Sequence, residues 1–108
     1  MQVHVPTLTN PILIRRVVSP SMAPKLRPGQ IVWATTLFRK LHPGQVVIIA
    51  QDNKEFIKRI ERIEKTDNEE ERLFVVGDNL DVSTDSRQFG WLDRRSVVAR
   101  VFKPNLAK

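Results

Sequence analysis

The chain has 108 residues, the length of one ordinary domain, and 41% of them are hydrophobic, which is enough to build a core. It has no cysteine, which excludes disulfide bonds and thiolate metal sites, and its two histidines are too few for a histidine-rich metal site. We therefore expect no metal and no cofactor. The net charge of +6 attracts anionic partners in general. No specific nucleic-acid partner is expected, because aromatic residues are not interleaved with the basic ones.

No apolar stretch approaches the ~20 residues that a transmembrane helix needs, and the longest covers only residues 46–50. Residues 1–14 contain two prolines and lack the apolar segment of a signal peptide. We expect a chain without a transmembrane segment, in the cytoplasm or at the membrane periphery. We expect a single domain over residues 12–108, preceded by an N-terminal extension of residues 1–11. The pattern predicts no oligomeric state.

Short runs rich in Val, Ile, Phe or Trp recur along the chain, and each is bounded by turn residues. In chain order, the expected strands cover residues 12–18, 30–38, 45–50, 55–63, 73–76 and 96–102. Residues 51–53 are interpreted as a hairpin tip, and residues 61–72, which carry no apolar stripe, as an exposed turn or strand extension. This spacing predicts an all-β fold, a small partly open barrel of short, mostly antiparallel strands.

Two similar phrases, Arg-Pro-Gly-Gln at residues 27–30 and His-Pro-Gly-Gln at residues 42–45, each precede an expected strand. Proline presets φ at the first central position of a turn, and glycine supplies the positive φ that the second position of a type II turn requires. Both phrases therefore predict type II turns.

The first candidate for chemistry is the segment Val-Ser-Pro-Ser-Met-Ala-Pro at residues 18–24, where an expected strand ends in a proline-constrained turn. Such a turn can expose a serine hydroxyl beside backbone N–H groups, but the hydroxyl is a poor nucleophile until a base takes its proton. His4 and His42 lie in polar segments without an acidic residue to orient them. On this segment alone, a surface turn is the better interpretation.

The second candidate is Lys58, in the expected strand 55–63. Alternate residues of a strand share a face, so Lys58 would lie between Phe56 and Ile60. Burial among apolar side chains lowers the pKa of a lysine, and a neutral lysine is a competent general base. The alternative is a lysine whose stem packs on apolar surface while its ammonium group reaches water.

The third candidate is the polar segment 76–90, which is dense in turn formers and oxygen acceptors. Its aspartates do not follow the ligand spacing of an EF-hand, and no glutamate closes the loop, so a calcium site is not expected. Asp85 and Arg87 could pair across a tight loop, and Ser83 could orient another polar group. The alternative is a loop held by its own hydrogen bonds.

Taken together and in this order, the three segments resemble signal peptidase I and its relatives, the S26 serine peptidases. The run Ser-Met-Ala-Pro from Ser21 is similar to the family's Ser-Met-x-Pro box, and Phe-Ile-Lys-Arg around Lys58 is similar to its lysine box. Gly-Asp-Asn from Gly77, followed by Ser83 and by Asp-Ser-Arg from Asp85, is similar to its long third box. The third box is specific, whereas a lone Ser-Met-x-Pro or Lys-Arg is weak.

The resemblance runs from about residue 17 to residue 102 and implies a serine endopeptidase that needs no histidine. Ser21 would be the nucleophile that forms an acyl-enzyme, and Lys58 would be the general base. The backbone N–H of Ser21 and the hydroxyl of Ser19 would form the oxyanion hole. Ser83 would orient the Lys58 amine, and Met22 would help to wall the substrate pocket.

Further implications concern the region behind the site and the turn before it. Asp85 and Arg87 would form a structural ion pair. The family often has glycine where this chain has Pro20; proline stiffens the turn but leaves the N–H of Ser21 in place. The Leu-Pro-Gly-Asp stretch that often follows the lysine box is absent, as are the large second β-domain of long bacterial enzymes and a membrane anchor.

These departures are typical of short family members, such as the proteases proposed to mature nickel-type superoxide dismutase by removing its N-terminal extension. The implied partner is a protein or peptide substrate, cleaved at an N-terminal extension or at a signal-type peptide, and peripheral membrane contact is compatible with the sequence. The cleavage site is not predicted.

The alternative function is a self-cleaving-repressor-like module, or an inactive binding and dimerisation module. Phage and SOS repressors share this kind of Ser–Lys β-domain and use it to dimerise. No helix-turn-helix precedes the domain here, and no Ala-Gly cleavage dipeptide lies upstream of Ser21. The intact Ser–Lys pair argues against an inactive scaffold.

Overall fold

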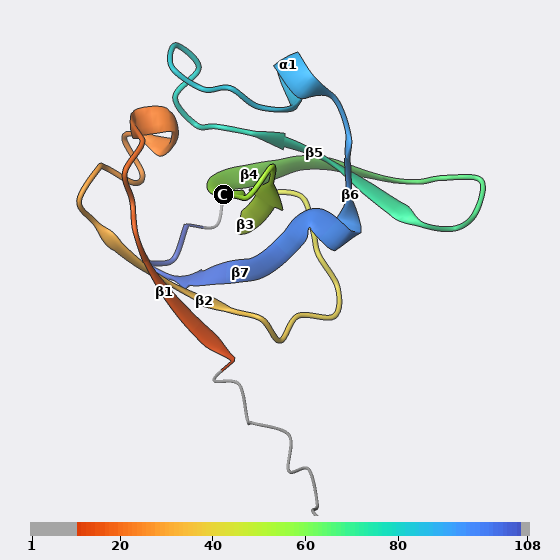
Figure 1. Cartoon of the computed structure of the whole chain (residues 1–108), viewed down its shortest axis with the longest axis horizontal. Coiled ribbons are helices and arrows are strands. Elements are labelled where there is room, and N and C mark those ends of the chain that lie inside the picture. The colour runs from red at the N-terminus through yellow and green to blue at the C-terminus, as the bar shows by residue number, and fades with distance from the viewer. Residues whose placement is uncertain (1–10, 107–108) are drawn as a thin grey trace, which may run out of the picture.

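A computed structural model describes residues 11–106, which form one antiparallel sheet in the order β1-β2-β7-β3-β4-β5-β6 (Figure 1). In this part of the chain, helix is confined to three short turns. The strands are β1 (Ile12–Arg16), β2 (Ile31–Thr35), β3 (Val46–Gln51), β4 (Lys54–Lys65), β5 (Glu71–Val76), β6 (Leu92–Asp93) and β7 (Val97–Lys103). The turns are η1 (Pro20–Met22), α1 (Ser86–Phe89) and η2 (Arg94–Ser96). The predicted all-β, antiparallel fold is confirmed.

All six expected strands are present, with ends that differ by a few residues. Residues 61–72 form the end of β4, the turn after it and the start of β5, as the lack of an apolar stripe indicated. β6 is the strand that the sequence did not predict, since two residues are too few to show an alternation of apolar and polar side chains. Most of the expected N-terminal extension, residues 1–11, lies outside the described residues, and so does His4.

Turn chemistry sets the register of the strands that carry the site. Gly29 and Gly44 have φ values of 95° and 94°, and the glutamine after each donates its N–H to the first carbonyl of the turn, at 3.1 and 3.2 Å. Both predicted type II turns are confirmed. Asp52 and Asn53 form the two-residue loop between β3 and β4 with φ of 52° and 63°, the positive values that a tight hairpin needs.

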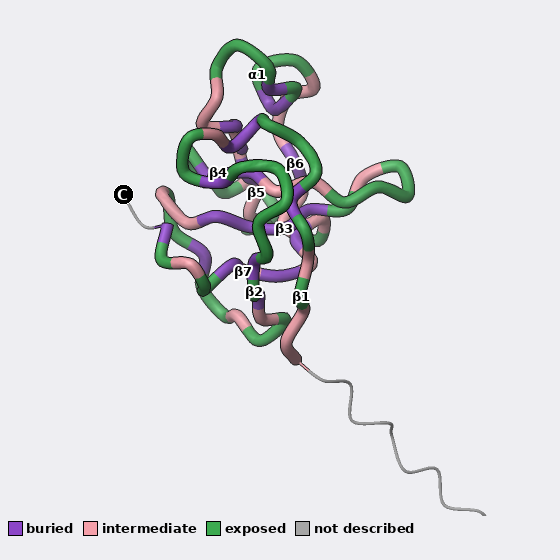
Figure 2. Tube along the Cα trace, turned by 90° about the vertical axis from the view of Figure 1, so that its left-hand side faces the viewer, coloured by how far each residue is buried: buried purple, intermediate pink, exposed green. Residues whose placement is uncertain are grey.

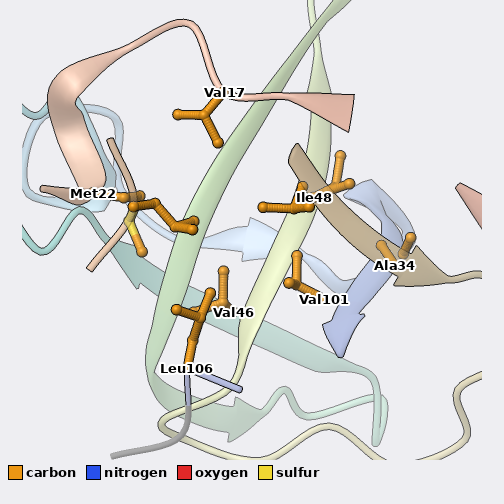
Figure 3. Close-up of a cluster of buried hydrophobic side chains, with 10 residues drawn as sticks. Val17, Met22, Ala34, Val46, Ile48, Val101 and Leu106 are labelled. Carbon is orange, nitrogen blue, oxygen red and sulfur yellow. The ribbon is translucent and has the colours of Figure 1, made fainter. Parts of the chain in front are cut away.

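The central strand β3 of the sheet is buried along most of its length (Figure 2). Val46 and Ile48 point into one apolar cluster, and Val47 and Ile49 point into another. Figure 3 shows the first cluster, in which side chains from separate strands and from the η1 turn converge. The longest apolar run of the sequence is therefore a strand buried on both faces. No helix within residues 11–106 has the length and apolar character to cross a membrane.

The sheet curls so that β1 approaches β4 without pairing to it. Leu13 and Ile57 pack against the same cluster, although no ladder joins their strands within the described residues. An ion pair links the two strands, with Arg15 Nε donating to Glu55 Oε1 at 2.7 Å. The result is a barrel that stays open between β1 and β4, and the candidate site lies along this opening.

Candidate active site

The turn η1 presents Ser21 at the opening of the barrel. Pro20 occupies the first helical position, where its missing N–H costs nothing, and Ser19 is the N-cap. Ser21 is 6% exposed, and Met22 after it is buried in the core (Figure 3). The turn is thus anchored by one apolar side chain while its serine lines a cavity.

The two groups expected to form the oxyanion hole lie together. The N–H of Ser21 donates to the hydroxyl oxygen of Ser19 at 3.2 Å. The Ser19 hydroxyl is free to rotate, so its own proton can be directed elsewhere. Both residues line the same cavity.

Lys58 is 3% exposed and lies in β4 opposite Val47 of β3. Its amine does not reach bulk water; Nζ donates to Ser83 Oγ at 3.1 Å. Burial lowers the pKa of Lys58, the negative charge of Asp85 opposes this effect, and the positive charge of Arg87 adds to it. The net effect is a pKa below the ordinary value for lysine, which raises the neutral fraction of the amine at a given pH.

Asp85 anchors the third segment and is fully buried. It accepts hydrogen bonds from Ser83 Oγ at 2.6 Å, from the Gly77 N–H at 2.9 Å and from Arg87 Nε at 2.9 Å. Burial alone would raise the pKa of Asp85, but these bonds hold it well below its usual range. Because the only hydroxyl proton of Ser83 goes to the Asp85 carboxylate, the Ser83 lone pairs face Lys58. The chain of bonds thus fixes one N–H of the Lys58 amine.

Asp85 also begins helix α1, which the sequence analysis did not predict. Its side chain accepts from the Arg87 N–H at 3.1 Å, while Gln88 Oε1 accepts from the Asp85 N–H at 2.9 Å. This reciprocal pair is a capping box. The signal was present as an aspartate three residues before a glutamine, but no apolar run followed it.

Gly77 allows the third segment to approach the η1 turn (Figure 1). A Cβ at this position would lie 2.1 Å from Ser83 Oγ and 2.7 Å from the Ser21 carbonyl oxygen. Asn79 holds the same turn, with its N–H donating to the Ser21 carbonyl at 2.8 Å and its Nδ2 donating to the Pro20 carbonyl at 3.1 Å. The sequence assigned no role to Asn79, whose only signal was its place in the Gly-Asp-Asn run.

A buried ion pair that the sequence analysis did not predict joins β4 to the third segment. Arg59 Nε and Nη2 donate to the two carboxylate oxygens of Asp78, each at 2.8 Å, and both side chains are almost fully buried. Arg59 Nη1 also donates to the carbonyls of Gly44 at 2.7 Å and Leu106 at 2.6 Å. Arg59 therefore ties a turn, a strand and the C-terminal segment together directly beside Lys58.

A cavity of about 530 Å³ lies between β1 and β4. Residues 15–19 line one side, and residues 54–58 line the other. Met22 and Ile48 contribute apolar surface to it, and Val82 and Thr84 of the third segment also line it. The cavity therefore has apolar walls and is long enough to run from the Arg15–Glu55 pair to Ser21 and Lys58.

The structure joins Lys58 to Ser83, and Asp85 to Arg87, directly. Within residues 11–106, it gives no hydrogen bond between the Lys58 amine and the Ser21 hydroxyl, although both residues line the cavity. Such bonds are often long in a substrate-free hydrolase and tighten when substrate binds. His42 is exposed in its Pro-Gly turn and does not line the cavity. In the described part of the chain, no three metal-binding side chains of His, Cys, Asp or Glu are grouped together.

Comparison with known proteins gives one family. A model of the family described as signal peptidase, peptidase S26, matches residues 61–105. The match includes the whole third segment, with Gly77, Ser83, Asp85 and Arg87, but it does not reach Ser21 or Lys58. No curated protein matches the chain. The family match and the all-β fold together support a signal peptidase I-like assignment within family S26.

Proposed function

We propose that the chain is a serine endopeptidase in which Ser21 is the nucleophile and Lys58 is the general base. The observation that carries the proposal is the Lys58 amine, which is buried, hydrogen-bonded to Ser83, and shifted to a lower pKa beside a cavity that Ser21 also lines. Burial keeps a lysine neutral without any histidine. The family supplies the substrate class, a protein or a peptide.

In the acylation step, Ser21 Oγ attacks the carbonyl carbon of the scissile bond while its proton moves to the neutral amine of Lys58. The C=O electron pair moves onto the oxygen, which the N–H of Ser21 and the hydroxyl of Ser19 stabilise. When the pair returns, the C–N bond breaks, and the leaving amine takes a proton from the Lys58 ammonium group. An ester on Ser21 remains.

Deacylation follows the same steps, with a water molecule in place of the Ser21 hydroxyl as the nucleophile. Lys58, neutral again, takes a proton from a water molecule that attacks the ester carbonyl, and the oxyanion forms at the same place. Collapse breaks the C–Oγ bond, and Ser21 Oγ receives the proton from Lys58. The products are a carboxylic acid and the free enzyme, so atoms and charge balance over the cycle.

The substrate would enter as an extended segment between β1 and β4. Within residues 11–106, β1 pairs only with β2, so an extended peptide can add as a strand along its other edge. The apolar walls around Met22 and Ile48 fit small apolar side chains next to the cleaved bond. An N-terminal extension or a signal-type peptide supplies such a segment without unfolding the mature protein.

The test is cleavage of two peptide sets, one with the sequences of signal peptides and one with those of the N-terminal extensions of soluble metalloenzymes of the nickel superoxide dismutase type. We expect the parent to cleave at least one set at a single bond, and the extension set faster. The Ser21→Ala variant, with the same circular dichroism spectrum, should cleave neither. Equal cleavage by Ser21→Ala would refute the proposal. No cleavage of either set, combined with concentration-dependent dimerisation, would favour the repressor-like or binding module.

A further inference from the structure

The Pro20–Ser21 peptide unit is held at both of its polar ends. The C=O of Pro20 and the N–H of Ser21 belong to one planar group, so turning one turns the other. At the N–H end the acceptor is Ser19 Oγ, at 3.2 Å. At the C=O end the donors are Asn79 Nδ2, at 3.1 Å, and the Ala23 N–H of the same turn, at 3.0 Å. The Ala23 bond holds this carbonyl within the turn, whereas the Asn79 bond fixes the peptide unit, and with it the Ser21 N–H, relative to the third segment.

Asn79 is itself fixed well enough to act as a reference. Its backbone N–H donates to the Ser21 carbonyl at 2.8 Å, so it is attached to the residue whose N–H it would orient. Its Oδ1 accepts from the Asp81 N–H at 3.3 Å, which directs Nδ2 toward Pro20. Gly77, where a Cβ would meet the Ser21 carbonyl oxygen, permits this close approach.

The two restraints do not act equally during the reaction. To stabilise a negatively charged oxygen, the Ser19 hydroxyl must direct its proton to that oxygen, and the Ser21 N–H must do the same. The Ser19–Ser21 bond is then weakened or lost. The proline ring fixes φ of Pro20 but leaves ψ of Pro20 and φ of Ser21 free. The peptide unit between them can therefore still rotate. The two hydrogen bonds to the Pro20 carbonyl remain, and the bond from Asn79 is the one that ties this peptide unit to the third segment.

We propose that Asn79 is a positioning residue, which aims the Ser21 N–H at the oxyanion by holding the carbonyl of the same peptide unit. This inference rests on the proposed function, because it assigns the Ser21 N–H to the oxyanion hole. A hydrogen bond to the Pro20 carbonyl also polarises the peptide group and strengthens donation from its N–H. Asn79 acts through this peptide unit and touches neither the nucleophile oxygen nor the substrate.

The experiment compares Asn79→Ala and Asn79→Asp with the parent and with Leu80→Ala, which truncates the exposed neighbour of Asn79 outside the cavity. Aspartate keeps the acceptor for the Asp81 N–H but removes the donor to Pro20, so it remains informative if the alanine variant folds poorly. Steady-state kinetics, the pH profile and the affinity for a peptide boronate, which forms a tetrahedral adduct on Ser21, are measured for each.

We expect both Asn79 variants to lose roughly tenfold to a hundredfold in kcat, less than the loss of an oxyanion donor itself. Boronate affinity should fall with kcat, while KM, the midpoint of the pH profile and the activity of Leu80→Ala stay at the parent values. A kcat within about twofold of the parent in either folded variant would overturn the inference. A change in KM as large as the change in kcat, or a shifted midpoint of the pH profile, would also overturn it. If Ser21→Ala retains activity, the proposed function itself fails; if Ser21→Ala is inactive and the Asn79 variants are not, only this inference fails.

Discussion

The Lys58→Met variant should lose peptide cleavage by roughly four to six orders of magnitude in kcat, as when one member of a catalytic unit is removed. Methionine matches the stem of lysine in volume but cannot accept a proton from the Ser21 hydroxyl. The fold should remain, because methionine fills the volume of the lysine stem and Ser83 keeps its hydrogen bond to Asp85. Single-turnover kinetics and thermal unfolding of the same preparation check both parts.

Three controls separate the loss of the base from a general disturbance. Lys58→Arg keeps a cation that does not deprotonate, so it should be as inactive as methionine. Ser83→Ala removes the acceptor that orients the amine and one donor to Asp85 but leaves the base itself in place, so its loss should be smaller. The double variant of Lys58→Met with Ser21→Ala should be no worse than either single variant, because the two residues act as one unit. A Lys58→Met variant that cleaves at the parent rate would contradict the proposed base.

The largest loss of stability is expected from Arg59→Met, at about 3–5 kcal/mol in the free energy of unfolding. The change leaves the Asp78 carboxylate buried beside an apolar side chain, and it leaves the carbonyls of Gly44 and Leu106 without their shared donor. Urea denaturation, followed by tryptophan fluorescence and by circular dichroism, gives this free energy.

A matched control is available on the surface. Arg15→Met removes the cationic partner from the Arg15–Glu55 pair, in which both side chains are 39% exposed, so it should cost less than about 1 kcal/mol. The double variant Arg59→Met with Asp78→Leu should regain part of the stability, since it also removes the buried negative charge. Equal costs for Arg59→Met and Arg15→Met would show that burial of the Arg59 pair contributes nothing.

Local patterns were sufficient to predict the strands. The turn residues at 27–30 and 42–45 and the hairpin loop at Asp52 and Asn53 have direct backbone consequences, and β3 is recognisable as a strand buried on both faces. β6 and α1 were missed for physical reasons. β6 has only two residues, too few to show the alternation of apolar and polar side chains that marks a strand. α1 has only four residues, which bury too little apolar surface to show a helical pattern.

The site was predictable only in part, because its residues come from three separate stretches of chain. Strand alternation placed Lys58 between two apolar side chains but left open whether its amine reaches water, and the resemblance brought Ser83 to its side. No sequence period reveals that Arg59 meets Asp78, or that the Asn79 carboxamide meets Pro20. Those contacts depend on how the third segment folds over the barrel, which the positions of Gly77 and η1 determine.

The central claim is that a buried, uncharged amine activates Ser21, and the pH dependence of kcat/KM tests it most directly. The neutral fraction of a lysine rises with pH through its pKa, and burial lowers the pKa of Lys58 below the ordinary value of 10.5. We predict a single rise in kcat/KM with a midpoint below that value, followed by a plateau, with the same midpoint for a rapid and a slow substrate. A rate that is independent of pH from mildly acidic to alkaline conditions, or one that rises only at the ordinary lysine pKa, would contradict the account.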